Sequence, residues 1–233
     1  MWRKVPDRTT PDRTTTVGRV GVLGDVHAED RHLELALAAF AEHRVDARLA
    51  VGDVLDGPGD ADRCCDLLQQ ANVLTVLGNH DRWWLHGQMR SVPHATGPLS
   101  ERSRAFIASL PATRALSTPM GTVLLCHGVG EDDMAALTPE TRGYSLQAIP
   151  ALRELMLSPD VSFIVGGHTH RRMVRRFQGL VAINAGTLLR DHEPGFVVID
   201  FEAAAVQFFD ILDGERIETA QAMDLPYPAP LHA

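Results

Sequence analysis

The chain has 233 residues, 45% of them hydrophobic, which suits a single domain built around one large core. Its net charge of −8 argues against a surface for long nucleic acid, and it contains no apolar run of the length that a membrane span requires. Three cysteines without Cys-x-x-Cys spacing, and an N-terminus without an apolar signal core, predict a cytoplasmic protein.

The two ends of the chain differ in composition from its middle. Residues 1–16 contain the polar, proline-interrupted motif Pro-Asp-Arg-Thr-Thr twice, which predicts a disordered N-terminal tail. Residues 226–233 are rich in proline and predict a C-terminal tail. We therefore expect one domain over residues 17–225, with a lid-like insertion near residues 82–118.

The first predicted strand and helix follow the N-terminal tail. The apolar run over residues 17–23 predicts a strand, and Asp25 and His27 come directly after it. Residues 31–43 have apolar side chains at helical spacing and predict a helix. His32 lies off the apolar stripe of this helix, so we expect it to be exposed.

Polar residues also follow the next two predicted strands. The strand over residues 47–51 is followed by Asp53 and Asp56. The strand over residues 72–77 ends in Gly-Asn-His-Asp at 78–81. Ligand-competent side chains therefore leave the sheet at the carboxyl ends of its strands, where open α/β sheets bind ligands.

An irregular segment over residues 82–98 begins with a pair of tryptophans, Trp83 and Trp84. Either they line a substrate cleft and stack on a base, or they pack the segment onto the core. The pattern does not choose between these roles.

The second half of the domain has more closely spaced strands. One predicted strand delivers His127, another delivers His168 and His170, and a third runs into Asn-Ala-Gly-Thr at 184–187. The remaining predicted elements are helices over 62–71, 99–110 and 151–157, strands over 121–126, 161–165 and 180–183, and a closing hairpin over 196–201 and 206–211. This order predicts an α/β fold, a four-layer α-β-β-α sandwich of two mixed sheets flanked by helices.

Carboxylate, amide and imidazole groups gather at the predicted strand ends. Five of the 11 histidines are among them, which a random surface distribution would not produce. The set is too large for one ion and suits two divalent ions. Because it mixes carboxylates with imidazoles and has no thiolate, it favours Mn, with Fe or Zn as alternatives, over Ca. Its members are Asp25, His27, Asp53, Asn79, His80, His127, His168 and His170. Cys126 should point to the opposite face of its strand from His127, because side chains alternate.

Such a pair of ions suggests a reaction. Two ions about 3.5–4 Å apart lower the pKa of a shared water, polarise a phosphoryl oxygen and align the phosphorus for displacement. Hydrolysis of phosphate esters is slow enough in water to demand this charge stabilisation. The sequence has no Gly-x-Ser-x-Gly, Walker or Cys-x5-Arg motif, so nothing indicates a covalent intermediate. We expect a metal-bridging hydroxide to attack a phosphodiester or phosphomonoester in line.

Five motifs occur in a fixed order along the chain: Asp25-x-His27, Gly52-Asp53-x-x-Asp56, Gly78-Asn79-His80-Asp81, Cys126-His127-Gly128 and Gly167-His168-Thr169-His170. In this order they resemble the motif set of the calcineurin-like metallophosphoesterase superfamily. The match covers residues 19 to about 190. The turn at 184–187 and the fragment Asp56-Gly57-Pro58-Gly59 make the chain resemble the small bacterial phosphodiesterase and phosphatase branch.

The resemblance implies two metal sites that share one carboxylate, Asp53. The ligands expected for the first metal are Asp25, His27 and His170. The ligands expected for the second metal are Asn79, His127 and His168. His80 is implied to be catalytic rather than a ligand, as a general acid or as a hydrogen-bond donor at the leaving group. Asp56 is expected to orient His80, and Asp81 to support the loop through backbone hydrogen bonds.

One feature departs from the protein phosphatase branch of this superfamily. That branch has Asp-Arg-Gly where this chain has Asp56-Gly57-Pro58, so an expected phosphate-binding arginine is missing. The candidates to replace it are Arg82, Arg142, Arg171 and Arg190.

The most favoured substrate is a small nucleotide-type or other small phosphoester. One alternative is a serine/threonine-type protein phosphatase, and another is a non-catalytic scaffold with the same fold. The complete ligand set and the presence of His80 argue against the scaffold. The acidic charge disfavours a nuclease, and we expect neither a membrane nor long nucleic acid as a partner. The sequence leaves open whether the protein forms an oligomer.

Overall fold

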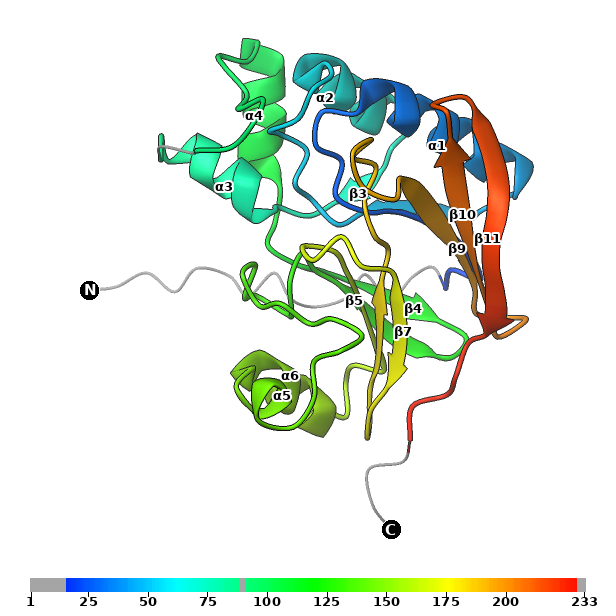
Figure 1. Cartoon of the computed structure of the whole chain (residues 1–233). Coiled ribbons are helices and arrows are strands. Elements are labelled where there is room, and N and C mark those ends of the chain that lie inside the picture. The colour runs from blue at the N-terminus through cyan, green and yellow to red at the C-terminus, as the bar shows by residue number, and fades with distance from the viewer. Residues whose placement is uncertain (1–15, 89–90, 230–233) are drawn as a thin grey trace.

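The computed structural model describes residues 16–88 and 91–229, so most of the predicted N-terminal tail lies outside the described residues. Two β-sheets face each other across an apolar layer, and helices cover the outer face of each sheet (Figure 1). This arrangement confirms the predicted four-layer α-β-β-α sandwich of two mixed sheets.

The first sheet has six strands, which come from both ends of the domain. They are β1 (Arg19–Leu23), β2 (Ala47–Ala50), β3 (Leu74–Thr75), β9 (Gly195–Asp200), β10 (Ala205–Leu212) and β11 (Arg216–Asp224). Their order across the sheet is β11-β10-β9-β1-β2-β3, with β1, β2 and β3 parallel and the other pairs antiparallel. The parallel strands therefore point their carboxyl ends to the same edge of the sheet.

The second sheet has five strands from the middle of the chain. They are β4 (Arg114–Thr118), β5 (Gly121–Leu125), β6 (Phe163–Gly166), β7 (Met173–Arg176) and β8 (Val181–Asn184). Their order is β4-β5-β6-β8-β7, and the three central strands are parallel. β6 and β8 are buried along their whole length, because both of their faces are covered.

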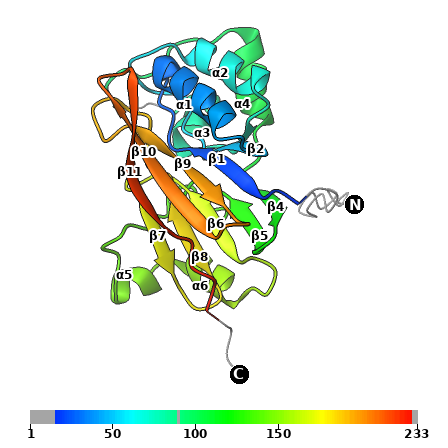
Figure 2. The same cartoon turned by 90° about the vertical axis from the view of Figure 1, so that its right-hand side faces the viewer.

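Six helices connect these strands in the part of the chain that the structure describes. They are α1 (Asp30–Glu42), α2 (Ala61–Gln70), α3 (Asn79–Leu85), α4 (Glu101–Ser109), α5 (Tyr144–Gln147) and α6 (Pro150–Leu157). Side chains cap the N-termini of α2 and α4. Asp60 accepts a hydrogen bond from the Arg63 amide at 2.9 Å, and Ser100 accepts one from the Ser103 amide at 3.2 Å. The turned view places α1, α2 and α4 over the first sheet and α5 and α6 at the other end of the molecule (Figure 2).

Three apolar clusters fill the layers. One lies between the first sheet and its helices and includes Phe40, and a second lies between the two sheets and includes Val22 and Val165. The third lies on the outer face of the second sheet and includes Cys126. Cys126 therefore points away from His127, as the alternation of side chains predicts.

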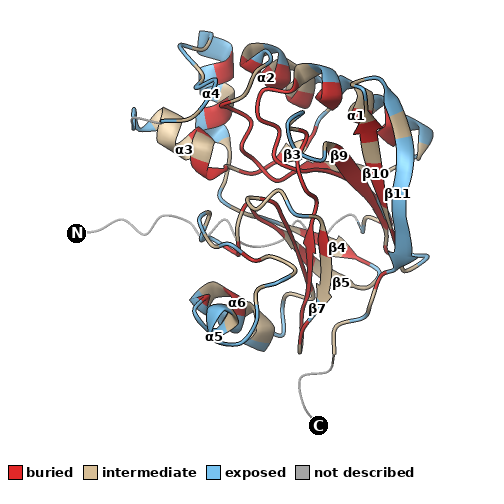
Figure 3. Cartoon of the chain, viewed as in Figure 1, coloured by how far each residue is buried: buried red, intermediate tan, exposed pale blue. Residues whose placement is uncertain are grey.

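The structure differs from the predicted elements at several places. Residues 79–85 form the helix α3 where an irregular segment was expected from residue 82. The strands β4, β7 and β11 and the short helix α5 were not predicted at all. β11 escaped notice because it is an edge strand with mostly polar, exposed side chains (Figure 3). Ala229, in the predicted C-terminal tail, makes a β-bridge with Gln178. His32 is buried rather than exposed, because its Nδ1 lies 2.7 Å from the Leu188 carbonyl oxygen.

Within residues 16–88 and 91–229, no helix combines the length and the apolar character needed to cross a bilayer. The cytoplasmic location and the division into tails, domain and lid stay predictions.

Candidate metal centre

The first sheet sends polar side chains into the site from three adjacent parallel strands. Asp25 and His27 follow β1, Asp53 and Asp56 follow β2, and Asn79 lies at the start of α3 just after β3. The strands are parallel neighbours, so these residues meet at one edge of the sheet.

The predicted ligands that follow strands of the second sheet are all imidazole groups. His127 follows β5, and His168 and His170 follow its parallel neighbour β6. The backbone amide of His168 donates to Asp25 Oδ1 at 3.0 Å, which joins the two sheets directly at the site.

Several of the site residues have a left-handed backbone, which is unfavourable for side chains other than glycine. Such strain is characteristic of functional sites, where the surrounding structure holds it in place. The residues and their φ angles are His27 (46°), Asp53 (46°), Asp56 (61°), His168 (65°) and His170 (55°). The tight turns aim side chains on neighbouring loops at a common point.

Two motif glycines make room for the carboxylates. A Cβ on Gly78 would collide with Asp53 Oδ1, and a Cβ on Gly167 would collide with Asp25 Oδ1. Both positions therefore require glycine for close packing against the ligand groups.

The first predicted ligand group is assembled. His170 Nε2 lies 3.0 Å from Asp25 Oδ2 and 3.0 Å from His27 Nε2. Asp25 Oδ2 is buried, and despite its short distance to His170 Nε2 it makes no hydrogen bond of acceptable geometry among the described residues. A buried carboxylate oxygen without a partner is costly, whereas a cation bound to it would remove that cost. The three residues thus fit a metal ion.

The second predicted group is assembled around the Asn79 amide. Asn79 Oδ1 lies 2.8 Å from His127 Nε2 and 3.0 Å from His168 Nδ1. One amide oxygen and two imidazole nitrogens are a donor set that suits Mn, Fe or Zn.

Asp53 lies between the two groups. Its Oδ2 is 3.3 Å from His127 Nε2 and 3.9 Å from His27 Nε2, so it faces one member of each group. Burial raises the pKa of the Asp53 carboxyl, but the contact with His127 outweighs it and the pKa is lowered. Burial lowers the pKa of His127, but the Asp53 and Asp25 carboxylates outweigh it and raise the pKa to about 10. The Asp53 carboxylate is therefore held in its charged form and stabilises positive charge next to it.

The outward nitrogens of the histidines are also held. His27 Nδ1 lies 2.8 Å from the Asp56 carbonyl oxygen, and His127 Nδ1 lies 2.8 Å from the Val51 carbonyl oxygen. His170 Nδ1 instead faces His192 Nδ1 at 3.3 Å. Such outer partners fix which ring nitrogen is free to bind a metal. Nothing in the sequence pointed to His192, because this residue lies within the loop between β8 and β9 and belongs to none of the five motifs.

His80 contacts acidic groups on two sides. Its Nδ1 lies 2.8 Å from Asp56 Oδ2, and its backbone amide donates to Asp53 Oδ1 at 2.9 Å. Burial lowers the pKa of His80, but the hydrogen bond to Asp56 and the nearby carboxylates outweigh it and raise the pKa. Asp81 accepts from the amides of Val54 and Gly78, at 2.9 and 3.1 Å, which is the loop-supporting role expected for it.

A cavity of about 440 Å³ opens onto this centre. Trp83, Val92 and Pro93 line it together with the polar groups, and the Trp83 ring lies 4.9 Å from the His80 ring. Trp84 packs against the apolar cluster beneath the helices and donates its indole N–H to the Gly97 carbonyl at 3.0 Å. The two neighbouring tryptophans thus divide the two roles between them: Trp83 faces the cavity and Trp84 packs the segment.

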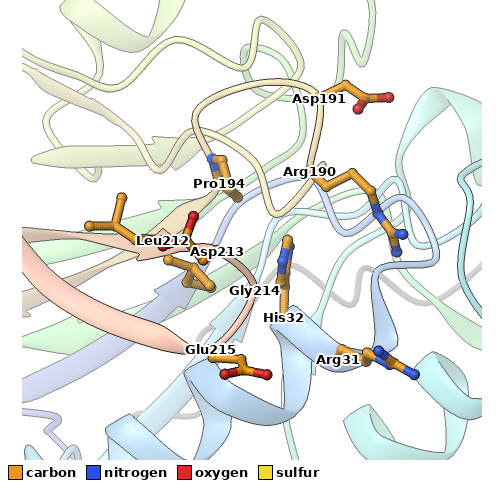
Figure 4. Close-up of a pocket in the computed structure, with 10 residues that line it drawn as sticks. Arg31, His32, Arg190, Asp191, Pro194, Leu212, Asp213, Gly214 and Glu215 are labelled. Carbon is orange, nitrogen blue, oxygen red and sulfur yellow. The ribbon is translucent and has the colours of Figure 1, made fainter.

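Three of the four candidate arginines form ion pairs, and the fourth, Arg142, does not line the cavity. Arg82 pairs with Asp133 at 2.6 Å, and Arg171 pairs with Glu140 at 2.8 Å. Arg190 pairs with the buried Glu29 at 2.7 Å and lines a separate cavity of about 600 Å³ beside His32 (Figure 4). Among residues 16–88 and 91–229, no arginine or lysine lines the cavity at the metal-type groups.

Fold and site together define a class of protein: two-sheet α/β sandwiches with metal-ligand groups gathered at strand ends of both sheets. The family model described as calcineurin-like phosphoesterase superfamily domain matches residues 19–204. The match covers more than half of the chain, so the chain belongs to the calcineurin-like phosphoesterase superfamily. A search of the curated proteins gives no significant match.

Solved structures share the fold at low sequence identity. A metallophosphoesterase from Sphaerobacter thermophilus aligns with a TM-score of 0.63 and 21% identity over 82% of this chain and 87% of that chain. The phosphoesterase YfcE from E. coli aligns with a TM-score of 0.55 and 14% identity over 89% of this chain and 100% of that chain. Vps29 from Entamoeba histolytica, solved with zinc, aligns with a TM-score of 0.53 and 16% identity over 89% and 99%.

Proposed function

We propose that this protein is a phosphoesterase that binds two divalent ions and hydrolyses a small phosphodiester. The observation that carries the proposal is the position of Asp53 Oδ2, which faces His127 in one ligand group and His27 in the other. A single oxygen placed between two ligand groups is what a shared pair of ions requires. When bound, the ions lower the pKa of a shared water and polarise a phosphoryl oxygen.

The chain's own residues would perform the remaining tasks. Asp25, His27 and His170 would hold one ion, and Asn79, His127 and His168 the other. His80 lines the same cavity as most of these residues and would serve the leaving oxygen of the ester. With Nδ1 bound to Asp56, His80 would donate a proton from Nε2 to that oxygen.

The cavity supports a diester over a monoester. Its described lining offers no arginine or lysine to neutralise a doubly charged monoester, whereas a diester carries a single charge. Trp83, Val92 and Pro93 offer an apolar wall for an organic group on the second ester oxygen. A planar group such as a base or phenyl ring would pack against the Trp83 indole.

The test uses Mn-loaded protein with bis(4-nitrophenyl) phosphate and 4-nitrophenyl phosphate. We expect faster turnover of the diester and loss of turnover in Asp53→Asn. Asp213→Asn, an exposed acid in the turn before β11, serves as the control and should retain full activity. Wild-type activity in Asp53→Asn would contradict the metal assignment. A strong preference for the monoester, or for a phosphoserine peptide, would favour the phosphatase alternatives. Failure to retain Mn, Fe or Zn, with no turnover, would favour a scaffold.

A further inference from the structure

Thr96, in the segment after α3, contacts Asp56, the residue that pairs with His80. Thr96 Oγ1 accepts a hydrogen bond from the Asp56 backbone amide at 2.8 Å, and the Thr96 backbone amide donates to Asp56 Oδ1 at 2.8 Å. The bonds run in opposite directions between the same two residues, so they fix both the backbone and the carboxylate of Asp56.

The two carboxylate oxygens of Asp56 thus have different partners. Oδ1 accepts from the Thr96 amide, and Oδ2 lies 2.8 Å from His80 Nδ1. The Asp56 side chain is fully buried and its backbone is left-handed, with φ of 61°. A substitution of the Thr96 side chain removes the bond that the Asp56 backbone amide makes to Oγ1, but it keeps the Thr96 amide that holds Oδ1. A shift of the Asp56 main chain that follows this loss would carry Oδ2 away from His80. Thr96 therefore acts on the angle at which His80 presents its ring.

The same segment forms a wall of the cavity. Val92, Pro93 and His94 line the cavity a few residues before Thr96, and Gly97 directly after it accepts the Trp84 indole N–H at 3.0 Å. The segment is therefore held from both sides: by Asp56 at the site and by Trp84 over the core.

We propose that Thr96 is a positioning residue for His80, acting through Asp56; the proposal rests on the proposed function. In the reaction, a water oxygen forms the new P–O bond and the bond to the leaving oxygen breaks. The leaving oxygen keeps the electron pair and takes the proton from His80 Nε2, so it departs as an alcohol. The attacking water loses a proton to solvent, and solvent returns one to His80. Thr96 aligns the donor for this transfer.

The first experiment compares two diesters on Mn-loaded enzyme: bis(4-nitrophenyl) phosphate and diphenyl phosphate. Nitrophenolate leaves readily without a proton, whereas phenolate depends on the general acid. We expect Thr96→Val to lower kcat/KM for diphenyl phosphate by about tenfold, a fraction of the whole effect of a general acid. The same change should leave bis(4-nitrophenyl) phosphate within about twofold, and Thr96→Ser should restore the diphenyl phosphate rate.

Thr118→Val is the matched control. Thr118 Oγ1 also accepts a backbone amide, from Met120 at 3.2 Å, but it lies at the β4–β5 turn outside the site. Thr118→Val should leave kcat/KM unchanged for both substrates. Equal loss on both substrates in Thr96→Val, or no recovery in Thr96→Ser, would overturn the proposal.

A double-mutant cycle tests whether Thr96 acts through His80. In a His80→Ala background, Thr96→Val should have no further effect on diphenyl phosphate turnover, because the group it positions is gone. A loss of the same size in both backgrounds would show that Thr96 acts by another route and would overturn the proposal.

A measurement without turnover separates this proposal from the proposed function. The imidazole ¹⁵N chemical shifts of His80, assigned with His80→Ala, report the hydrogen bond at Nδ1 in metal-free protein at fixed pH. Thr96→Val should shift the Nδ1 resonance and Thr96→Ser should not. An unchanged resonance in Thr96→Val would overturn the Thr96 proposal even in an active enzyme. A shifted one would sustain the Thr96–Asp56–His80 connection even if no phosphoester were hydrolysed.

Discussion

The two sheets bring different chemistry to the same site. The first sheet supplies the carboxylates of Asp25 and Asp53 and the amide of Asn79, whereas the second supplies only imidazoles. Both predicted groups draw from both sheets, since His170 joins Asp25 and His127 joins Asn79. Neither sheet alone carries a complete group. The site therefore exists only when the apolar layer between the sheets is packed.

The largest expected difference between the sheets is one of charge. Asp25→Asn removes a negative charge from the first sheet, and His168→Gln removes a neutral ligand from the second. We expect kcat/KM on bis(4-nitrophenyl) phosphate to fall on the order of a thousandfold in the first and on the order of tenfold in the second. Metal content by elemental analysis should fall more in the first variant. Equal losses would remove the distinction between the sheets.

Metal binding should stabilise the packing of one sheet against the other. A ligand that binds only the folded state adds about 2.7 kcal/mol at a hundred times its Kd. We expect Mn added to metal-free protein to raise the urea midpoint accordingly, and chelation to reverse it. His127→Ala should show a smaller rise, because one cross-sheet ligand is missing. If added Mn leaves the urea midpoint of the wild-type protein unchanged, the sheets are not joined by metal.

His192 offers a finer comparison between histidines that have different outer partners. His170 Nδ1 meets the side chain of His192, whereas His127 Nδ1 meets a backbone carbonyl. His192→Ala should weaken binding of one of the two metals by about tenfold, as loss of an outer partner does elsewhere. Titration calorimetry on metal-free protein measures this, with Glu193→Ala as the neighbouring control. Unchanged affinities in His192→Ala would mean that the contact does not tune His170.

Trp83 and Trp84 are neighbours in the chain, but Trp83 lines the cavity and Trp84 packs against the core. Trp83→Ala should raise KM for an aryl diester by about fivefold, since stacked aromatic pairs contribute about 1 kcal/mol, and should leave the urea midpoint unchanged. Trp84→Ala should lower the free energy of unfolding by about 2 kcal/mol, because its side chain packs on the core, with KM unchanged. The reverse pattern would exchange their roles.

The smallest effect concerns the cysteines, which lie on outer layers of both sheets. Burial raises the pKa of the Cys65 and Cys126 thiols to about 12. Below that pH the reactive thiolate is scarce, so the native protein should resist an aromatic disulfide reagent at pH 8. Unfolded protein should release the signal of all three cysteines. Rapid reaction of native protein would show that one of these layers opens.

The order of residues along the chain was enough to predict which residues gather at the candidate metal centre. Asp25, Asp53, Asn79 and His127 each follow a short apolar run, and parallel strands bring their carboxyl ends to one edge of each sheet, so the two-sheet fold and the set of ligand residues were predictable. The division of that set into two groups came from the resemblance to the superfamily. Gly78 and Gly167 were likewise visible as motif residues, although the reason for them, the space taken by two carboxylates, was not.

Tertiary structure alone decided the partners that come from distant, patternless segments. His192 reaches His170 from a loop, and Thr96 reaches Asp56 across 40 residues. The same holds for Arg190, which pairs with Glu29 instead of lining the cavity at the candidate metal centre. It also holds for His32, whose Nδ1 contacts the Leu188 carbonyl oxygen in the interior. A periodic pattern reports which face of an element is apolar, whereas loop geometry depends on what the finished fold places opposite each side chain.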